Sequence, residues 1–260
     1  MLNVQNIQYR ISQSLSLSDI SFDMEAGEMV VILGANGAGK STLLNIITGS
    51  VKMNSGSVLI NKLPIQYWKS KELATFAAVM QQQNPLQLPF TVYEVVMMGR
   101  YPHFKRKETE DDAAIVNEVL HKTGIQHLKQ RNYLTLSGGE QQRVHLARVL
   151  AQISGTRRDE PCYLFMDEPS NNLDIRHQHG ALGIAKTFAR EGNCVLAVLH
   201  DLNLALQYAD KIILLKNGKM KGFGIPSDIM TEESISEVYD LPLSIFHPPM
   251  GKHPMVMPLV

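Results

Sequence analysis

An excess of charge of either sign is missing from this sequence: 25 Lys and Arg residues balance 25 Asp and Glu residues. Nucleic-acid binding through a broad basic surface is therefore not expected. Cysteine is scarce too, because the chain holds only Cys162 and Cys194, and both stand within apolar runs. Such cysteines are expected to be small buried side chains of a protein in a reducing compartment, not disulfide partners or metal ligands.

Long hydrophobic runs are also absent. No stretch approaches the ~20 consecutive apolar residues that cross a bilayer, and the start MLNVQNIQYR lacks the basic and apolar regions of a signal peptide. Any membrane role is expected to depend on a partner. The 260 residues, 44% of them hydrophobic and 19% charged, have an ordinary globular composition. That length suits one large domain or two small ones.

Apolar and polar residues alternate over residues 2–9 and 15–24, which predicts two half-buried antiparallel strands at the N-terminus. A continuous apolar run over residues 28–33 predicts a buried strand, and a glycine-rich stretch and helical spacing follow it. Further apolar runs, separated by segments of helical length, cover residues 162–167, 193–200 and 210–218. This order predicts an α/β fold with a mostly parallel core sheet.

Helical patterns replace strand patterns between about residues 82 and 153, so we expect an inserted α-helical subdomain there. Residues 1–81 and 154–260 would then form the sheet domain, including the antiparallel β-subdomain. The tail from Phe246 carries four prolines, and we expect it to be an extended strap.

A glycine-rich segment matches the phosphate-loop pattern G-x-x-x-x-G-K-[ST], between a predicted buried strand and a predicted helix. Backbone N–H groups of such a loop surround a phosphate, Lys40 would reach the outer phosphates, and Ser41 would offer a hydroxyl to Mg²⁺. A chance glycine turn is the alternative, which the flanking strand and helix disfavour. The predicted nucleotide-binding residues are Gly34, Ala35, Asn36, Gly37, Ala38, Gly39, Lys40, Ser41 and Thr42.

The apolar run at 162–166 ends in two carboxylates, Asp167 and Glu168. Open α/β sheets bind their ligands at the carboxyl ends of strands. We expect Asp167 to hold Mg²⁺ and Glu168 to orient or deprotonate the water that attacks a γ-phosphate. The alternative is a solvent-exposed acidic pair that caps the next helix, and the phosphate loop in the same chain disfavours it.

A second candidate anion site comprises Ser137, Gly138, Gly139 and Glu140, at the start of a predicted amphipathic helix. Ser137 suits the N-cap position, and the two glycines allow another backbone to approach closely. A plain capping box is the alternative, because Glu140 follows Ser137 by three residues. Capping alone does not require the two glycines.

The phosphate loop, LSGGE, FMDEPSNNLD and His200, in this order, resemble the ATP-binding-cassette (ABC) ATPase family over almost the whole chain. The resemblance implies a P-loop NTPase (RecA-like) core that hydrolyses ATP with Mg²⁺. It also implies a homodimer in which residues 137–140 of one subunit close over the γ-phosphate held by the other. The resemblance further implies that Gln81 senses Mg²⁺, with Gln82 as the alternative. It implies that His200 contacts the γ-phosphate and that Asp174 belongs to the loop that crosses the dimer interface.

Two positions depart from the family pattern. Family members usually stack an aromatic residue on adenine, whereas this sequence has Ile11 at that position, with Tyr9 nearby. Glu140 replaces the commoner glutamine of the signature. The helix dipole favours an acid in a first turn, so we expect activity to survive this change.

Residues 91–103 (TVYEVVMMGRYPH) are similar to the segment that faces the membrane permease in importers of iron chelates, haem and cobalamin. Residues 147–179 and 238–254 look most like those of haem-importer ATPases. The resemblance implies a peripheral subunit on the cytoplasmic face of a bacterial inner membrane, served indirectly by a substrate-binding protein. A siderophore or cobalamin importer, or a soluble scaffold for iron–sulfur cluster assembly, are the alternatives.

Overall fold

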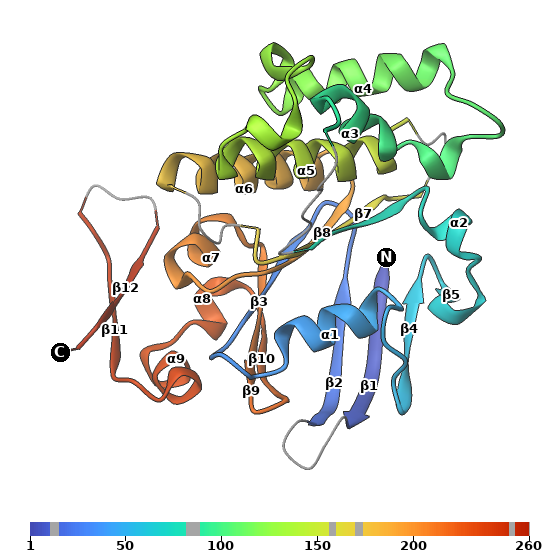
Figure 1. The fold of residues 1–260 in the computed structure, drawn as a ribbon. Helices are drawn as coiled ribbons and strands as arrows, with labels where there is room; N and C mark the ends of the chain where they lie inside the picture. Colours follow the sequence, from blue (N-terminus) through green and yellow to red (C-terminus); the bar gives the residue numbers. More distant parts are fainter. Residues whose placement is uncertain (11–15, 82–88, 156–159, 170–173, 250–252, 260) are drawn as a thin grey trace.

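A computed structural model describes residues 1–10, 16–81, 89–155, 160–169, 174–249 and 253–259. One ten-stranded sheet organises this part of the chain (Figure 1). In order across the sheet, its strands are β5 (Leu63–Pro64), β4 (Ser55–Ile60), β1 (Leu2–Arg10), β2 (Ser16–Met24), β10 (Lys219–Gly224), β9 (Lys211–Lys216), β3 (Met29–Leu33), β8 (Cys194–Val198), β7 (Tyr163–Asp167) and β6 (Ala77–Met80).

The sheet contains both the antiparallel strands and the parallel core that the sequence predicts. Strand β1 pairs antiparallel with β2 and β4, whereas β9, β3, β8, β7 and β6 pair in parallel. Strand β10 runs antiparallel to β9 and meets β2 through a bridge between Lys219 and Ser18, which joins the two parts. Every residue of β3 and β8 is buried, as is typical of parallel strands inside an α/β domain. The predicted fold class is confirmed.

Helices also alternate with the strands along the chain. They are α1 (Lys40–Ile47), α2 (Ser70–Leu73), α6 (Ile175–Arg190), α7 (Leu202–Tyr208), α8 (Pro226–Ile229) and α9 (Glu232–Tyr239), and the 3-10 turn η1 (Ile65–Tyr67) precedes α2. Helix α1 packs on β7 and β8, while α6 packs on β8 and β3. Cys162 and Cys194 are free and buried, as predicted. None of the described helices is long and apolar enough to cross a membrane.

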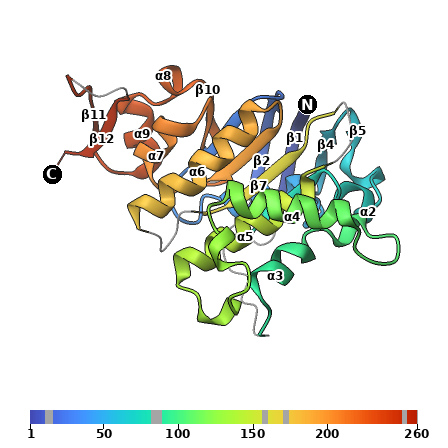
Figure 2. The same cartoon turned by 90° about the horizontal axis from the view of Figure 1, so that it is seen from above.

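Three helices lie together over one end of the sheet, α3 (Val92–Met98), α4 (Glu110–Lys122) and α5 (Gly138–Ile153) (Figures 1 and 2). Each begins with a capping box, in which the N-cap side chain and the acid three residues later satisfy each other's backbone N–H groups. Helix α5 packs on both α3 and β6, so it connects this helical layer to the sheet. The boundaries of the subdomains at residues 82 and 153 stay predictions.

The expectation of an extended C-terminal strap is wrong. Strand β11 (Leu243–Phe246) pairs antiparallel with β12 (Met255–Pro258), and the two form a separate hairpin beside α7 (Figure 1). The prolines did not prevent pairing because Pro248 and Pro249 lie in the connection and Pro258 is the last residue of its strand. Proline is tolerated at such ends, where no ladder hydrogen bond needs its missing N–H.

Candidate functional site

The parallel strands bring four predicted site segments to one edge of the sheet. Gly34 follows β3, Gln81 follows β6, Asp167 ends β7 and His200 stands just beyond β8. Val198 of β8 pairs with both Ile32 and Asp167, and Met80 pairs with Met166, so the strand ends lie level with one another. Carboxyl ends of parallel strands are where open α/β sheets bind ligands.

The phosphate loop is closed around the side chain of Lys40. The Lys40 ammonium donates hydrogen bonds to the carbonyl oxygens of Gly34, at 2.8 Å, and Ala35, at 3.1 Å. Burial lowers the pKa of Lys40, while the nearby carboxylates of Glu168 and Asp167 act in the opposite direction. The amine of Lys40 thus lies inside a loop of backbone N–H groups at a helix N-terminus, which is a site for phosphate oxygens.

The loop also requires glycine for steric reasons. Gly39 precedes α1 with a φ of 99°, in the left-handed region. A Cβ atom added there would lie 2.6 Å from the Cδ2 atom of Leu17. The N-terminal antiparallel strands therefore press directly on the loop.

Ser41 and Asp167 provide two adjacent oxygen ligands beside the loop. The Ser41 hydroxyl donates a hydrogen bond to Oδ1 of Asp167 at 3.0 Å. Burial raises the pKa of Asp167, and the hydrogen bond from Ser41 opposes that rise. A hydroxyl and a carboxylate that share a site with phosphate oxygens form the hard oxygen set that Mg²⁺ prefers. Gln81, which is exposed and follows the strand next to β7, stands level with Asp167 on this edge.

Glu168 and His200 form a close pair across the ends of β7 and β8. Oε1 of Glu168 lies 2.5 Å from Nε2 of His200. The backbone of Glu168 is left-handed, with a φ of 51°, and its N–H donates to the carbonyl oxygen of Val198. A non-glycine residue in this conformation is uncommon, and such residues cluster at functional sites. The turn fixes where the carboxylate points after the strand has ended.

The signature residues make a real capping box at the start of α5. The Ser137 hydroxyl accepts from the N–H of Glu140, and the Glu140 carboxylate accepts from the N–H of Ser137 at 2.8 Å. The backbone hydrogen bond from Ser137 lowers the pKa of Glu140. A Cβ atom on Gly138 would meet no atom within 4 Å, whereas one on Gly139 would touch the His177 ring. A capped helix start and an exposed glycine therefore coexist here.

Asp174 caps α6 and stands at the surface. Its carboxylate accepts from the N–H of His177 at 2.9 Å and lies 2.8 Å from Nδ1 of the same ring. The next residue, Ile175, is 73% exposed. His179 contacts Tyr208 instead, so the two histidines serve different neighbours.

Comparison with known proteins identifies the family. The family model described as ABC transporter matches residues 17–171. The chain belongs to the ABC transporter family. Among the relatives, the hemin import ATP-binding protein HmuV of Gloeobacter violaceus is 43% identical over 259 residues, which cover 100% of this chain and 94% of that protein. HmuV of Myxococcus xanthus is 40% identical over 257 residues, covering 99% and 96%.

Solved structures agree with this fold. An inward-facing ABC transporter, described as a putative metal-chelate type, aligns over 100% of this chain and 97% of its own with a TM-score of 0.85 at 24% identity. A dimeric ABC cassette bound to ADP and phosphate aligns over 86% of this chain and 98% of its own, with a TM-score of 0.73 and 27% identity. As a member of the ABC transporter family with the full motif set, this chain is an ATPase.

Ile11, at the position where the family stacks an aromatic residue on adenine, and Gln82, the alternative to Gln81, lie outside the described residues. Tyr9 lies within them, in β1, half-buried and paired with Leu17, the residue that touches Gly39. Tyr9 is therefore held near the phosphate loop of this ABC ATPase, and its role at adenine stays a prediction.

Tyr239 is a site residue that the sequence analysis missed. It ends α9, and its hydroxyl accepts a hydrogen bond from the N–H of Gly34 at 3.2 Å. Burial raises the pKa of Tyr239 to about 12, so the phenol stays protonated. A tyrosine in an ordinary amphipathic helix carries no sequence signal for contact with a loop 205 residues away.

Proposed function

We propose that this chain is the ATP-hydrolysing subunit of a hemin importer, bound to a membrane permease at the cytoplasmic face of the membrane. The observation that carries the proposal is similarity along the full chain, at 38–43% identity, to proteins named as hemin import ATP-binding proteins. That similarity extends through the helical segment and the C-terminal tail, not only through the ATPase motifs shared by all cassettes.

The proposed hydrolytic step uses the close pair formed by Glu168 and His200. Water attacks the γ-phosphorus, the bond between that phosphorus and the bridging oxygen to ADP breaks, and Glu168 takes the proton from the water. The 2.5 Å contact with His200 holds the carboxylate at the end of β7. The His200 ring, just beyond β8, is proposed to contact the γ-phosphate.

Lys40 and the loop N–H groups bind the phosphates in this proposal. Ser41 and Asp167, with Gln81 beside them, would hold Mg²⁺, whose chemistry is to neutralise the charge on the phosphate oxygens. The hydrogen bond between Ser41 and Asp167 supports this placement, because both oxygens already converge on one point beside Lys40.

The chain is proposed to act as a homodimer with shared sites. Ser137 and Gly138 are exposed at the start of α5, and the open space beside Gly138 suits the approach of another molecule's nucleotide. Ile175 exposes 73% of its apolar side chain next to Asp174. Exposed apolar and glycine positions beside a catalytic edge favour a partner there. A related cassette is itself a dimer.

The proposed permease surface is the segment at residues 91–103. Arg100, within it, is buried and bonds Asp112 at 2.9 Å and the carbonyl oxygens of Ala151 and Ser154. His103 bonds the carbonyl oxygen of Gln152 at 2.7 Å. The segment is thereby tied to α4 and to the C-terminal end of α5, the helix that begins with the signature. Movement of the permease can reach the shared ATP site through one rigid helix.

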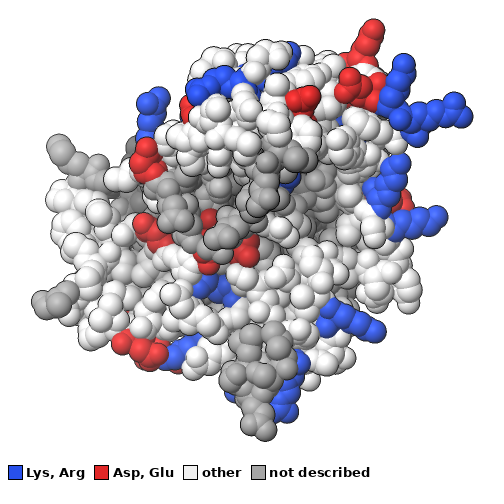
Figure 3. Space-filling view, in the orientation of Figure 1, with Lys and Arg blue, Asp and Glu red and all other residues white. Residues whose placement is uncertain are grey.

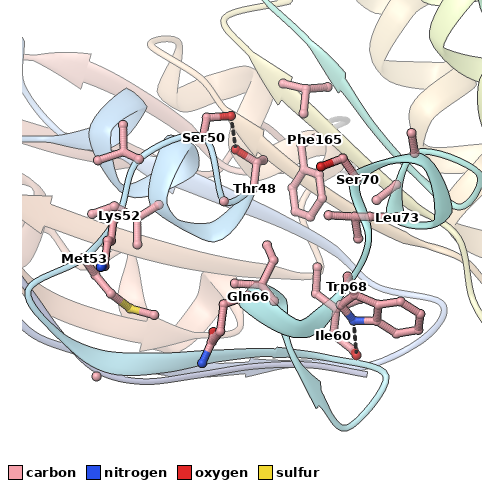
Figure 4. Close-up of a pocket in the computed structure, with 18 of the residues that line it drawn as sticks. Thr48, Ser50, Lys52, Met53, Ile60, Gln66, Trp68, Ser70, Leu73 and Phe165 are labelled. Carbon is pink, nitrogen blue, oxygen red and sulfur yellow. Dashed lines mark hydrogen bonds between the residues drawn. The ribbon is translucent and has the colours of Figure 1, made fainter.

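A hollow of about 630 Å³ lies beside α2 (Figure 4). It is bounded by the end of α1, by β4, and by η1, α2 and β6, and its lining includes Trp68, Leu73 and Phe165. Lys71 of α2, a helix that borders the hollow, donates to the carbonyl oxygen of Phe104 at 3.0 Å, and Phe104 directly follows the 91–103 segment. Tyr67 and Tyr101, exposed by 70% and 58%, add aromatic surface of the kind enriched at protein interfaces. A permease segment is proposed to dock here.

Coexpression with the candidate permease tests the function. The expected result is a membrane complex whose ATP hydrolysis is stimulated by hemin-loaded binding protein, together with loss of growth on hemin as sole iron source after deletion. If stimulation of ATP hydrolysis and growth require a siderophore or cobalamin instead of hemin, the cargo belongs to that class. Purification without any membrane partner, with failure of iron–sulfur enzymes after deletion, would replace import by a scaffold role.

A further inference from the structure

The ring of His177, in the first turn of α6, packs against residues 137–140 of the same chain, which we call the signature turn. A Cβ atom built on Gly139 would lie 3.0 Å from Nδ1 of His177 and 3.3 Å from two of its ring carbons. Non-bonded carbon atoms prefer separations of about 3.5–4.0 Å. The ring therefore fills the space that a side chain at position 139 would need. Among the described residues, nothing fills the corresponding space beside Gly138.

Asp174 fixes the orientation of that ring. Oδ1 of Asp174 accepts from the N–H of His177 at 2.9 Å and lies 2.8 Å from its Nδ1, so one carboxylate oxygen holds both the backbone and the ring. The backbone hydrogen bond from His177 lowers the pKa of Asp174. An ionised carboxylate only accepts, so Nδ1 carries the hydrogen in this contact. The His177 side chain, 26% exposed, is thus bonded on one side and packed on a glycine on the other.

A second contact attaches the start of α5 to the same stretch of chain. The side-chain amide of Gln142 donates to the carbonyl oxygen of Pro169 at 3.1 Å, and Pro169 directly follows Glu168. Helices α5 and α6 also pack on each other. The first two turns of α5 are therefore joined to both ends of the segment that leads from Glu168 to His177.

Carboxylates are numerous around this edge of the molecule. Figure 3 shows acidic side chains near the middle of the face turned to the viewer, where Figure 1 places α7 and the end of β7. Asp167 ends β7, Asp174 caps α6 and Asp201 caps α7. A triphosphate brings further negative charge, and like charges repel each other. The donation from His177 keeps the Asp174 carboxylate bonded within its own chain.

We propose that His177 is a positioning residue for ATP hydrolysis, which holds the signature turn and Asp174 of one chain in the arrangement that completes the ATP site of the other chain. This role rests on the shared-site homodimer of the proposed function and adds a residue to it. The ring acts through Gly139 and Asp174 and does not itself touch the nucleotide. Small misplacements of the groups around a reacting centre reduce the rate strongly, so a residue that only positions them has a large effect on turnover.

Replacement of His177 should separate ATP binding from turnover. His177→Ala should lower ATP turnover about tenfold, because the signature turn loses its support. ATP affinity of the dilute chain, measured by nucleotide fluorescence, should change less than about twofold, because an interaction made only in the closed site does not affect ground-state binding. His177→Gln keeps an amide that can donate to Asp174 and should recover part of the turnover. His179→Ala is the matched control, since His179 contacts Tyr208 two positions further along α6.

Mixing of variants shows which composite site depends on His177. In a large excess of Lys40→Ala chain, a small amount of wild-type chain hydrolyses ATP with its own loop and the signature turn of the excess chain. Adding His177→Ala to the excess chain should lower this turnover about tenfold. The same change in the minor chain should lower it far less, because the signature turn of that chain faces an inactive loop. A variant that is merely less stable would act equally in both positions.

The outcomes separate this role from the proposed function. Equal losses in the two mixing arms, equal turnover of His177→Ala and His179→Ala, or a loss of ATP affinity as large as the loss of turnover would each overturn it. The mixture of Lys40→Ala with Ser137→Arg tests the shared sites with His177 intact. If that mixture gains activity while His177→Ala behaves like wild type, the positioning role is rejected and the proposed function stands. If that mixture gains none, the shared sites themselves are rejected.

Discussion

Oε1 of Glu168 lies 2.5 Å from Nε2 of His200, and this contact joins the carboxyl ends of two neighbouring parallel strands. The two residues are 32 positions apart in the sequence. The left-handed turn at Glu168 is what brings its carboxylate to the ring after β7 has ended. The carboxylate that we propose as the base for the attacking water is therefore held in place at the end of the sheet.

Replacement of Glu168 by Gln should lower ATP turnover by ~10²-fold or more, because the amide keeps the shape of the side chain and cannot take a proton. ATP binding should persist, since Lys40 and the loop are untouched. Phosphate release and nucleotide-binding fluorescence measure the two effects. As a comparison, His200→Gln retains an amide that can still bond Glu168 and should lose less activity than His200→Ala. Unchanged turnover in Glu168→Gln would reject the assignment.

Mixing two inactive variants should restore activity if the sites are shared. A dimer of Lys40→Ala with Ser137→Arg contains one intact site, which combines the loop of one chain with the signature of the other. Statistical mixing of equal amounts gives about a quarter of the wild-type number of sites. The measurement is ATP hydrolysis of the mixture against each variant alone. No gain on mixing, with both variants folded and dimeric, would contradict shared sites.

Asp112→Ala should destabilise the chain by about 3–5 kcal/mol, because it leaves the buried Arg100 guanidinium without its carboxylate. Hydrogen bonds from Thr109 and Arg100 lower the pKa of Asp112 against the opposing effect of burial, so the carboxylate is charged at neutral pH. Asp111→Ala is the matched control, since Asp111 is exposed in the same helical turn and should cost below about 0.5 kcal/mol. Urea denaturation compares the two. Equal effects would mean that the buried pair contributes nothing particular.

His145 should make the chain less stable in mild acid. Burial lowers its pKa to about 4, and Nε2 is 2.7 Å from the Tyr133 hydroxyl. The unfolded pKa of histidine is about 6.5, so unfolding takes up a proton between these values and stability is lost as the pH falls from 6.5 to 4.

The test of His145 is a difference between variants. Wild-type chain should lose about 2 kcal/mol more than His145→Gln between pH 7.5 and pH 5. His121→Gln, which removes an exposed histidine of α4, should follow the wild-type curve. Denaturant unfolding at both pH values measures the change, and parallel curves for wild type and His145→Gln would show that this ring is not held neutral by burial.

The C-terminal tail is a region where the sequence pattern led to a wrong prediction. Four prolines suggested an extended strap, yet Met255–Pro258 pairs with Leu243–Phe246. The decisive factors were the position of each proline within the hairpin and the anchoring of Val256 by Asn203. The number of prolines in the tail contains no information about either factor.

The sequence by itself determined the phosphate loop, the capped start of α5 and the buried strands that precede Gly34 and end at Asp167. These features depend on residues close together in the chain, where spacing fixes the hydrogen bonds and the exposed face. Only the tertiary structure decided that Tyr239 contacts Gly34, that Arg100 is clamped by Asp112, and that His200 meets Glu168. Such contacts arise when strands pair in a particular order and helices pack upon them, and local spacing holds no record of which distant side chains that packing brings together.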